Sequence, residues 1–87
     1  MSAAEDLSQQ LTEMADATDE QAAALAELKQ GLSDQAESVA NQLDNTQTGQ
    51  DLAESFRTAM DAVQDASERL GEAATGARDY ASQLLAM

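Results

Sequence analysis

The feature of this sequence that most constrains its fold is an apolar residue at almost every helical turn, in two long runs. The first run extends from Leu7 to Leu43 in 10 steps over 36 residues, a mean spacing of 3.6 residues, which is the repeat of an α-helix. The polar segment Asp44–Asp51 interrupts the pattern before a second run from Leu52 to Leu84. The sequence therefore predicts an all-α fold, a two-helix antiparallel hairpin.

The expected domain organisation is one helical hairpin over residues 1–87. The first helix is predicted at about residues 4–44, the turn at about 45–48, and the second helix at about 49–85. Gly31 lies inside the first helix, but the apolar spacing continues across it, so we expect no break there. For the turn residues we expect Asn45 in a left-handed conformation, Thr48 as the cap of the second helix, and Gly49 next to it.

The large apolar residues of the two runs are the candidate core of the hairpin. They are Leu7, Leu11, Met14, Leu25, Leu28, Leu32, Val39, Leu43, Leu52, Phe56, Val63, Leu70 and Leu84. A further apolar strip on the second helix is broader than one seam requires, and it is the candidate partner interface: Met60, Ala74, Ala81 and Leu85.

The composition favours association. Of the apolar residues, 19 are alanine, so a lone hairpin has few large side chains to bury. We expect two hairpins to pair into a four-helix bundle dimer. The partner is thus a protein, as a homodimer or as a heterodimer with another helical hairpin, and the sequence leaves both open.

The charge excludes other classes of partner. Seventeen acidic residues against four cations give a formal net charge of −13. Such a surface repels nucleic-acid phosphates and anionic lipid headgroups, so we expect no nucleic acid and no membrane span. The acidic residues are interpreted as a solvated face. The alternative is an acidic inhibitor that occupies the basic groove of another protein.

The available chemistry argues against an enzyme. The chain has no histidine and no cysteine, so the usual general base, thiol nucleophile and soft metal ligands are missing. Glu13, Asp16 and Glu20 share one helix face, but a calcium site needs a loop that surrounds the ion with oxygens. We therefore expect no catalytic residue, no cofactor and no metal ion.

The sequence begins without the basic and apolar segments of a signal peptide. Its longest apolar run, Ala22–Ala26, is too short for a membrane span. We expect the protein to be made in the cytoplasm. Any secretion would use a route that does not depend on a signal peptide.

The segment Ala53–Met60, with its aromatic Phe56 about two turns into the second helix, and the late Tyr80 in an alanine-rich helix resemble the WXG family. These proteins are small helical hairpins exported by type VII secretion systems. The resemblance covers most of the chain in layout but only about residues 48–80 in sequence. It implies a secretion substrate or its co-exported partner, which acts by pairing with another hairpin.

Two motifs of the family are absent. Thr48–Gln50, or Gln47–Gly49 with a shift of one residue, stands where the family has Trp-x-Gly. The fourth residue after Tyr80 is Leu84, where the export signal has Asp or Glu. The resemblance therefore implies a divergent relative or the partner that lacks the signal. The rival interpretation is a structural coiled-coil segment of a larger assembly, which a strict 3.5-residue spacing would favour over the 3.6 counted above.

Overall fold

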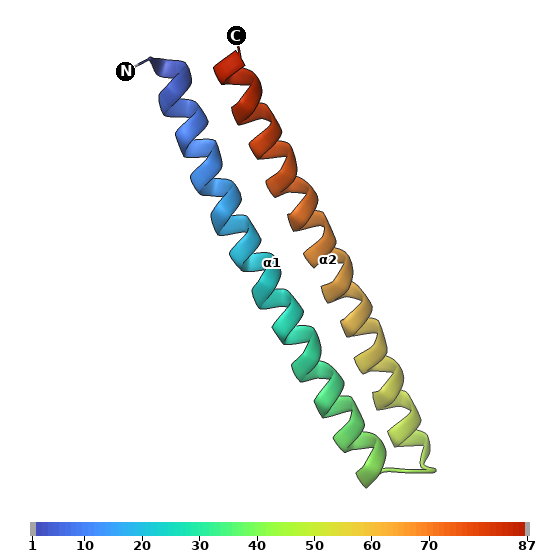
Figure 1. The fold of residues 1–87 in the computed structure, drawn as a ribbon. Helices are drawn as coiled ribbons and strands as arrows, with labels where there is room; N and C mark the ends of the chain where they lie inside the picture. The colour runs from blue at the N-terminus through green and yellow to red at the C-terminus, as the bar shows by residue number, and fades with distance from the viewer. Residues whose placement is uncertain (1, 87) are drawn as a thin grey trace.

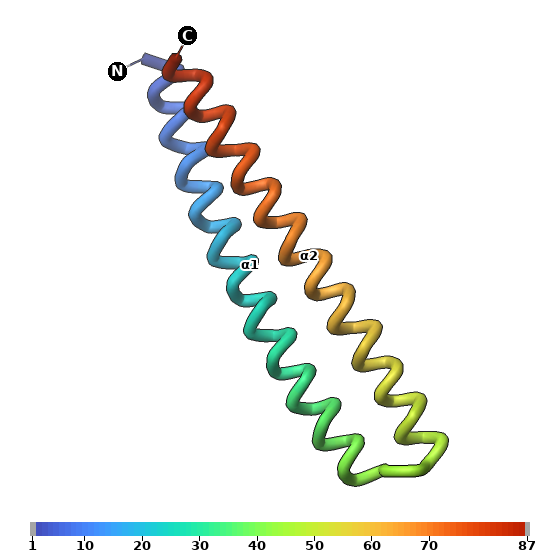
Figure 2. Tube along the Cα trace, turned by 45° about the vertical axis from the view of Figure 1, so that its right-hand side comes forward, coloured from blue at the N-terminus to red at the C-terminus, as the bar shows by residue number. Residues whose placement is uncertain are grey.

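A computed structural model describes residues 2–86 of the chain as an antiparallel helical hairpin (Figure 1). Helix α1 (Ala3–Gln42) and helix α2 (Gln47–Ala86) have 40 residues each and lie side by side along their whole length in both views (Figures 1 and 2). The rod measures 64 × 14 × 12 Å. The fold class is the one predicted, with α1 two residues shorter at its end and α2 two residues longer at its start.

Helix α1 begins with a side-chain cap. Ser2 has an extended backbone, and its hydroxyl oxygen accepts a hydrogen bond from the Glu5 backbone N–H at 3.1 Å. Glu5 and Asp6 in the first turn place negative charge near the positive end of the helix dipole. The start of the helix is therefore fixed by local chemistry that does not depend on α2.

The turn confirms one expectation and corrects two. Asn45 has a φ of 62°, the left-handed conformation predicted for it. The cap of α2, however, is Thr46, whose Oγ1 accepts a hydrogen bond from the Gly49 N–H at 2.9 Å and donates one to the Leu43 carbonyl at 2.7 Å. Thr48 therefore lies inside α2 rather than at its cap. Since α2 begins at Gln47, Gly49 lies in its first turn, and it is buried there.

The seam between the helices follows a heptad spacing. Its less exposed residues on α1 alternate in steps of four and three, and α2 does the same. They are Ala4, Ser8, Leu11, Ala15, Thr18, Ala22, Leu25, Lys29, Leu32, Ala36, Val39 and Leu43 of α1, with Gly49, Ala53, Phe56, Met60, Val63, Ser67, Leu70, Ala74, Ala77, Ala81 and Leu84 of α2. The mean step is 3.5 residues, which corrects the value of 3.6. The larger value arose because the count began at Leu7, which lies beside the seam, instead of at Ser8. Met14 and Leu28 also lie beside the seam, but they do not change the mean.

One row of this seam consists mostly of small residues and brings the two backbones close together. Ser8 donates its hydroxyl to the Ala81 carbonyl at 3.1 Å, and Ser67 donates to the Ala22 carbonyl at 3.2 Å. Both bonds have the same register, because the 14 residues from Ser8 to Ala22 match the 14 from Ala81 back to Ser67. Among the described residues, the buried positions of the seam are all small: Ser8, Ala15, Gly49, Ala74 and Ala81.

Gly49→Ala tests the close approach at the turn. A Cβ at residue 49 would overlap the Leu43 carbonyl oxygen, whereas a Cβ at Gly71 would meet nothing within 4 Å. We expect Gly49→Ala to lower the free energy of unfolding by about 1–3 kcal/mol, as overpacking does. Gly71→Ala is the control and should raise it by about 0.5–1 kcal/mol through helix propensity. Thermal unfolding followed by circular dichroism measures both, and equal effects would contradict the close contact.

Ala74→Leu tests the close contact of the small seam residues in the half of the rod that holds the two termini. Ala74 is 1% exposed, so a leucine there must push α1 away and break the register of the serine bonds. The expected loss is again about 1–3 kcal/mol. Ala23→Leu is the matched control, because Ala23 is exposed on the outer side of α1. Urea unfolding of the two variants should separate them, and a stable Ala74→Leu hairpin would show that the helices do not pack this closely.

Candidate functional site: the acid-free face

The acidic residues occupy only part of the circumference of each helix. We label the seven positions of the heptad by the seam: row a contains Ser8 and Ala81, and row d contains Leu11 and Leu84. Positions e and g flank the seam, e beside a and g beside d. Asp44 lies in the turn, and the 16 acidic residues within the helices all fall at positions b, e or f. Positions c and g of both helices carry none.

The two g rows lie on the same side of the hairpin. On the opposite side, at the e positions, Arg78 of α2 contacts Asp19 of α1, which shows that e faces e across the seam. On the g side, one small surface pocket, which we call the notch, is lined by residues of both helices. They include Leu32 of α1 and Leu52 and Phe56 of α2. Positions c and g therefore form one continuous strip over both helices, which we call the acid-free face. Its residues are Ala3, Leu7, Gln10, Met14, Ala17, Gln21, Ala24, Leu28, Gly31, Gln35, Ser38 and Gln42, with Thr48, Leu52, Ser55, Ala59, Ala62, Ala66, Arg69, Ala73, Gly76, Tyr80 and Gln83.

The acid-free face carries most of the exposed large apolar side chains of the described residues. Six such side chains are exposed, and five of them lie on this face: Leu7, Met14, Leu28, Leu52 and Tyr80. Met14 is the most exposed at 62%, and Leu28 is exposed at 50%. An exposed apolar strip of this kind, bordered by charged rows, is a candidate binding surface.

The acid-free face also contains a notch of about 240 Å³ near the turn end of the rod. Leu32, Leu52, Phe56 and Ala59 give it apolar walls, and Ser55 lies at its rim. The notch exists because Ala59 is too small to cover the space between the larger side chains of the two helices. It has the size and lining to receive one apolar side chain from outside.

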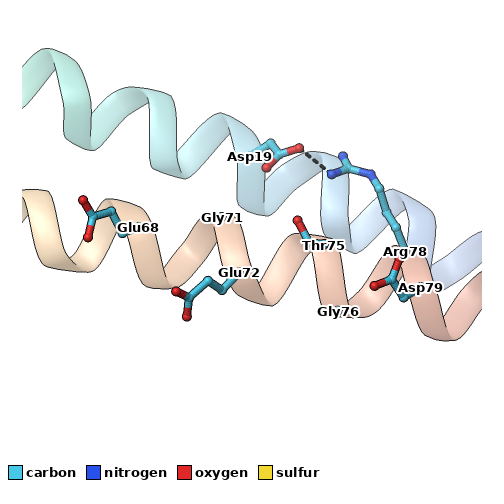
Figure 3. A pocket seen from close by; sticks show the side chains of 8 residues that line it. All are labelled: Asp19, Glu68, Gly71, Glu72, Thr75, Gly76, Arg78 and Asp79. Carbon is cyan, nitrogen blue, oxygen red and sulfur yellow. Dashed lines mark ion pairs between the residues drawn. The ribbon is translucent and has the colours of Figure 1, made fainter.

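The opposite edge of the hairpin is electrostatic. Arg78 reaches from α2 to α1, where its guanidinium donates hydrogen bonds to Asp16 at 2.8 Å and to Asp19 at 2.6 Å. These bonds, first that with Asp16, raise the pKa of Arg78 above its ordinary value. Figure 3 shows Arg78 and Asp19 pointing toward each other, with Glu72 directed away from α1; all three side chains line a shallow hollow.

Several polar side chains near the e edge and in the seam are paired within the hairpin. The hollow beside Arg78 is lined by carboxylates, glycines and Thr75, and Arg78 itself is paired with two carboxylates of α1. The serine hydroxyls Ser8 and Ser67 are engaged with backbone carbonyls across the seam. Within residues 2–86, no cluster of acidic side chains is arranged to hold a metal ion.

The structure divides the predicted core residues into two groups. Nine of them lie half-buried in the seam: Leu11, Leu25, Leu32, Val39, Leu43, Phe56, Val63, Leu70 and Leu84. The other four, Leu7, Met14, Leu28 and Leu52, are exposed at the g positions, so their placement in the hairpin core is wrong. The reason is the heptad spacing, which rotates the g row out of the seam toward solvent.

The predicted partner interface needs the opposite correction. Ala74 and Ala81 are 1% and 4% exposed and pack against α1, because small side chains permit the closest contact between the helices. Met60 is half-buried in the same row a. Leu85 is exposed at 61%, but it lies at an e position, away from the acid-free face. The signal that would have found this face is in the sequence: the acidic residues avoid two of the seven heptad positions.

Comparisons with known proteins add no relative: no family model, no curated protein and no solved structure matches this chain. No helix among the described residues combines the length and the apolar character that crossing a bilayer requires. The functional argument therefore depends on the geometry and the charge of the hairpin itself.

Arg78→Gln tests the electrostatic edge. Loss of its bonds to Asp16 and Asp19 should lower the melting temperature at low ionic strength, because α1 then keeps two carboxylates without a cation. Salt screens exposed charges, so the difference from the unmodified chain should shrink at about 1 M NaCl. Arg69→Gln is the control, since Arg69 pairs with Asp65 within α2 at 2.9 Å and does not join the helices. A salt-independent loss at Arg78 would contradict the electrostatic origin.

Proposed function

We propose that this protein is a non-enzymatic helical interaction module that binds another helical hairpin through its acid-free face. The observation that carries the proposal is the segregation of charge on the rod. Five of the six exposed large apolar side chains lie on the strip that no acidic residue enters. Removing such a strip from water is favourable, and no buried carboxylate opposes it.

The shape of the face defines the kind of partner. The face runs the length of a rod 64 Å long, so its natural complement is another long helical surface rather than a small ligand. Pairing of two hairpins along such faces gives a four-helix bundle. With four cations in the whole chain, neither nucleic acid nor an anionic membrane finds a complementary charge.

The proposed biological setting is type VII secretion, as a substrate or as its co-exported partner. Its support is the resemblance of Ala53–Met60 and Tyr80 to the WXG family, together with the layout of two 40-residue helices around one short turn. In this proposal the protein is made in the cytoplasm and leaves by a route that does not depend on a signal peptide. Tyr80 lies on the acid-free face, so pairing would cover it.

A structural coiled-coil segment is the second candidate function. The observation in its favour is the 3.5-residue spacing of the seam, which is the spacing of a coiled coil. Such a segment, which we call a spacer, would hold other parts of an assembly apart, and for this role it requires only the seam and the turn. Its acid-free face would stay accessible in the cell, which separates it from an interaction module.

Occupancy of the face can be measured with single cysteines, because the chain has none of its own. Gln21→Cys places a thiol on the acid-free face, and Ala23→Cys places one on the outer side of the same helix turn; both positions are exposed. In extracts of the cells that make the protein, maleimide should modify residue 21 about tenfold more slowly than residue 23. A partner at about ten times its Kd leaves roughly one chain in ten free.

The reference for this experiment is the urea-unfolded chain, in which both thiols should react at the same rate. Equal rates in the native extract would contradict an interaction module and favour the spacer. The result does not depend on the identity of the partner.

A further inference from the structure

We propose that the occupant of the acid-free face is a second copy of this chain, packed antiparallel to the first, with Met14 of each copy level with the notch of the other. This inference rests on the proposed function and names its partner. Three observations carry it: the distribution of charge, the area of the face, and the positions of Met14 and the notch along the rod.

The charge distribution leaves one surface on which two copies can meet. Each chain has a net charge of −13, and like charges repel at every other orientation. When two acid-free faces meet, the b, e and f rows of both copies point away from the contact, and the carboxylates remain in water. Arg69 is the one charged residue of the face, and it is held by Asp65 of its own helix. A strongly basic partner would find its complement on the outer rows instead.

The area of the face matches what a stable dimer needs. The rod is 64 Å long and 14 Å across the two helices, so the face covers roughly 900 Å². Stable interfaces bury about 800 Å² on each partner. The face reaches this value only when the rods overlap along their full length, which requires the centres of the two copies to coincide.

Full overlap brings the most exposed apolar side chain level with the notch. Met14 is 62% exposed, and the notch lies beside Leu32 near the turn end. Halfway between these two residues is position 23, within one residue of the middle of α1 (Ala3–Gln42). A twofold axis across the rods at this point exchanges the heights of Met14 and the notch. At each of the two heights, Met14 of one copy therefore faces the notch of the other, which is the self-complementarity of a twofold interface.

The same axis places Leu28 of one copy level with Thr18 of the other, one helical turn from Met14 of that second copy and on the same side of the axis as the notch that this Met14 meets. Gly31 lies between Leu28 and the notch on the same face, and no atom lies within 4 Å of the site where its Cβ would be. This open space lets the long methionine side chain approach α1 closely. Close to the axis, Gln21 and Ala24 of α1 and Ala66 of α2 are uncharged, and Arg69, three residues from Ala66, is paired with Asp65 of its own helix.

The first experiment measures mass and orientation on the purified chain. Light scattering at about 100 μM should give a molar mass twice that of the 9.2 kDa chain. A spin label at Gln10→Cys reports the orientation, because antiparallel overlap about position 23 separates the two labels by about 40 Å along the rod. Parallel rods would bring them to the same height, within about 25 Å. A monomeric mass or a short distance overturns the inference.

Met14→Glu tests the fit of Met14 to the notch. The substitution places a carboxylate in the apolar contact and should lower the dimer association constant at least about 100-fold, as an unpaired charge in an interface does. Ala23→Glu makes the same change of net charge on the outer side of α1 and should leave the dimer intact. Circular dichroism must show that both variants keep their helices. A dimer that survives Met14→Glu contradicts the inference.

The two proposals can fail separately. If the pure chain is monomeric while residue 21 is protected in cell extracts, the face binds a different protein, and only the second copy is ruled out. If residue 21 is accessible in both settings, the interaction module itself is contradicted.

Discussion

The constraint on which this structure depends is the close contact between two rows of small residues. A serine hydroxyl can reach a main-chain carbonyl of the other helix only where no larger side chain separates the backbones, as at Ser8–Ala81 and Ser67–Ala22. These two bonds and the short turn fix the antiparallel register. The register in turn decides which rows face solvent, so the acid-free face follows from the smallest side chains of the chain.

The all-α hairpin and the place of its turn could be predicted from the sequence, because periodic apolar residues and a polar break indicate them directly. The division between seam and surface could not be predicted by hydrophobicity. The apolar spacing predicts Leu7, Met14, Leu28 and Leu52 in the core, and it predicts Ala74 and Ala81 in a strip beside it. In the hairpin Ala74 and Ala81 are the more deeply buried, since helices that approach closely leave room mostly for alanine and serine at row a. The capping residue was misplaced for a similar reason: Thr46 and Thr48 are equally suited by chemistry, and packing of Gly49 against Leu43 decides between them.

The arrangement of charge leaves this acidic chain one long face without a carboxylate. A random distribution of 17 carboxylates over both helices would place several in any contact as long as the rod. Their restriction to b, e and f keeps every carboxylate in water when the c and g rows are covered. The cross-helix bonds of Arg78 lie on the e edge, so the charged interactions and the apolar contact occupy opposite sides of the hairpin.

Lys29 interrupts the row of small residues. The register that pairs Ser8 with Ala81 and Ala22 with Ser67 places Lys29 opposite Met60, so the two longest side chains of row a meet near the middle of the rod. The lysine ammonium turns outward to the Gln64 amide oxygen at 2.9 Å rather than into the seam. This layer therefore places two long side chains in a row that is otherwise filled mostly by alanine and serine, and it separates the small-residue layers toward the termini from those toward the turn. The Lys29–Gln64 bond gives the e edge a second contact between the helices, closer to the turn than that of Arg78.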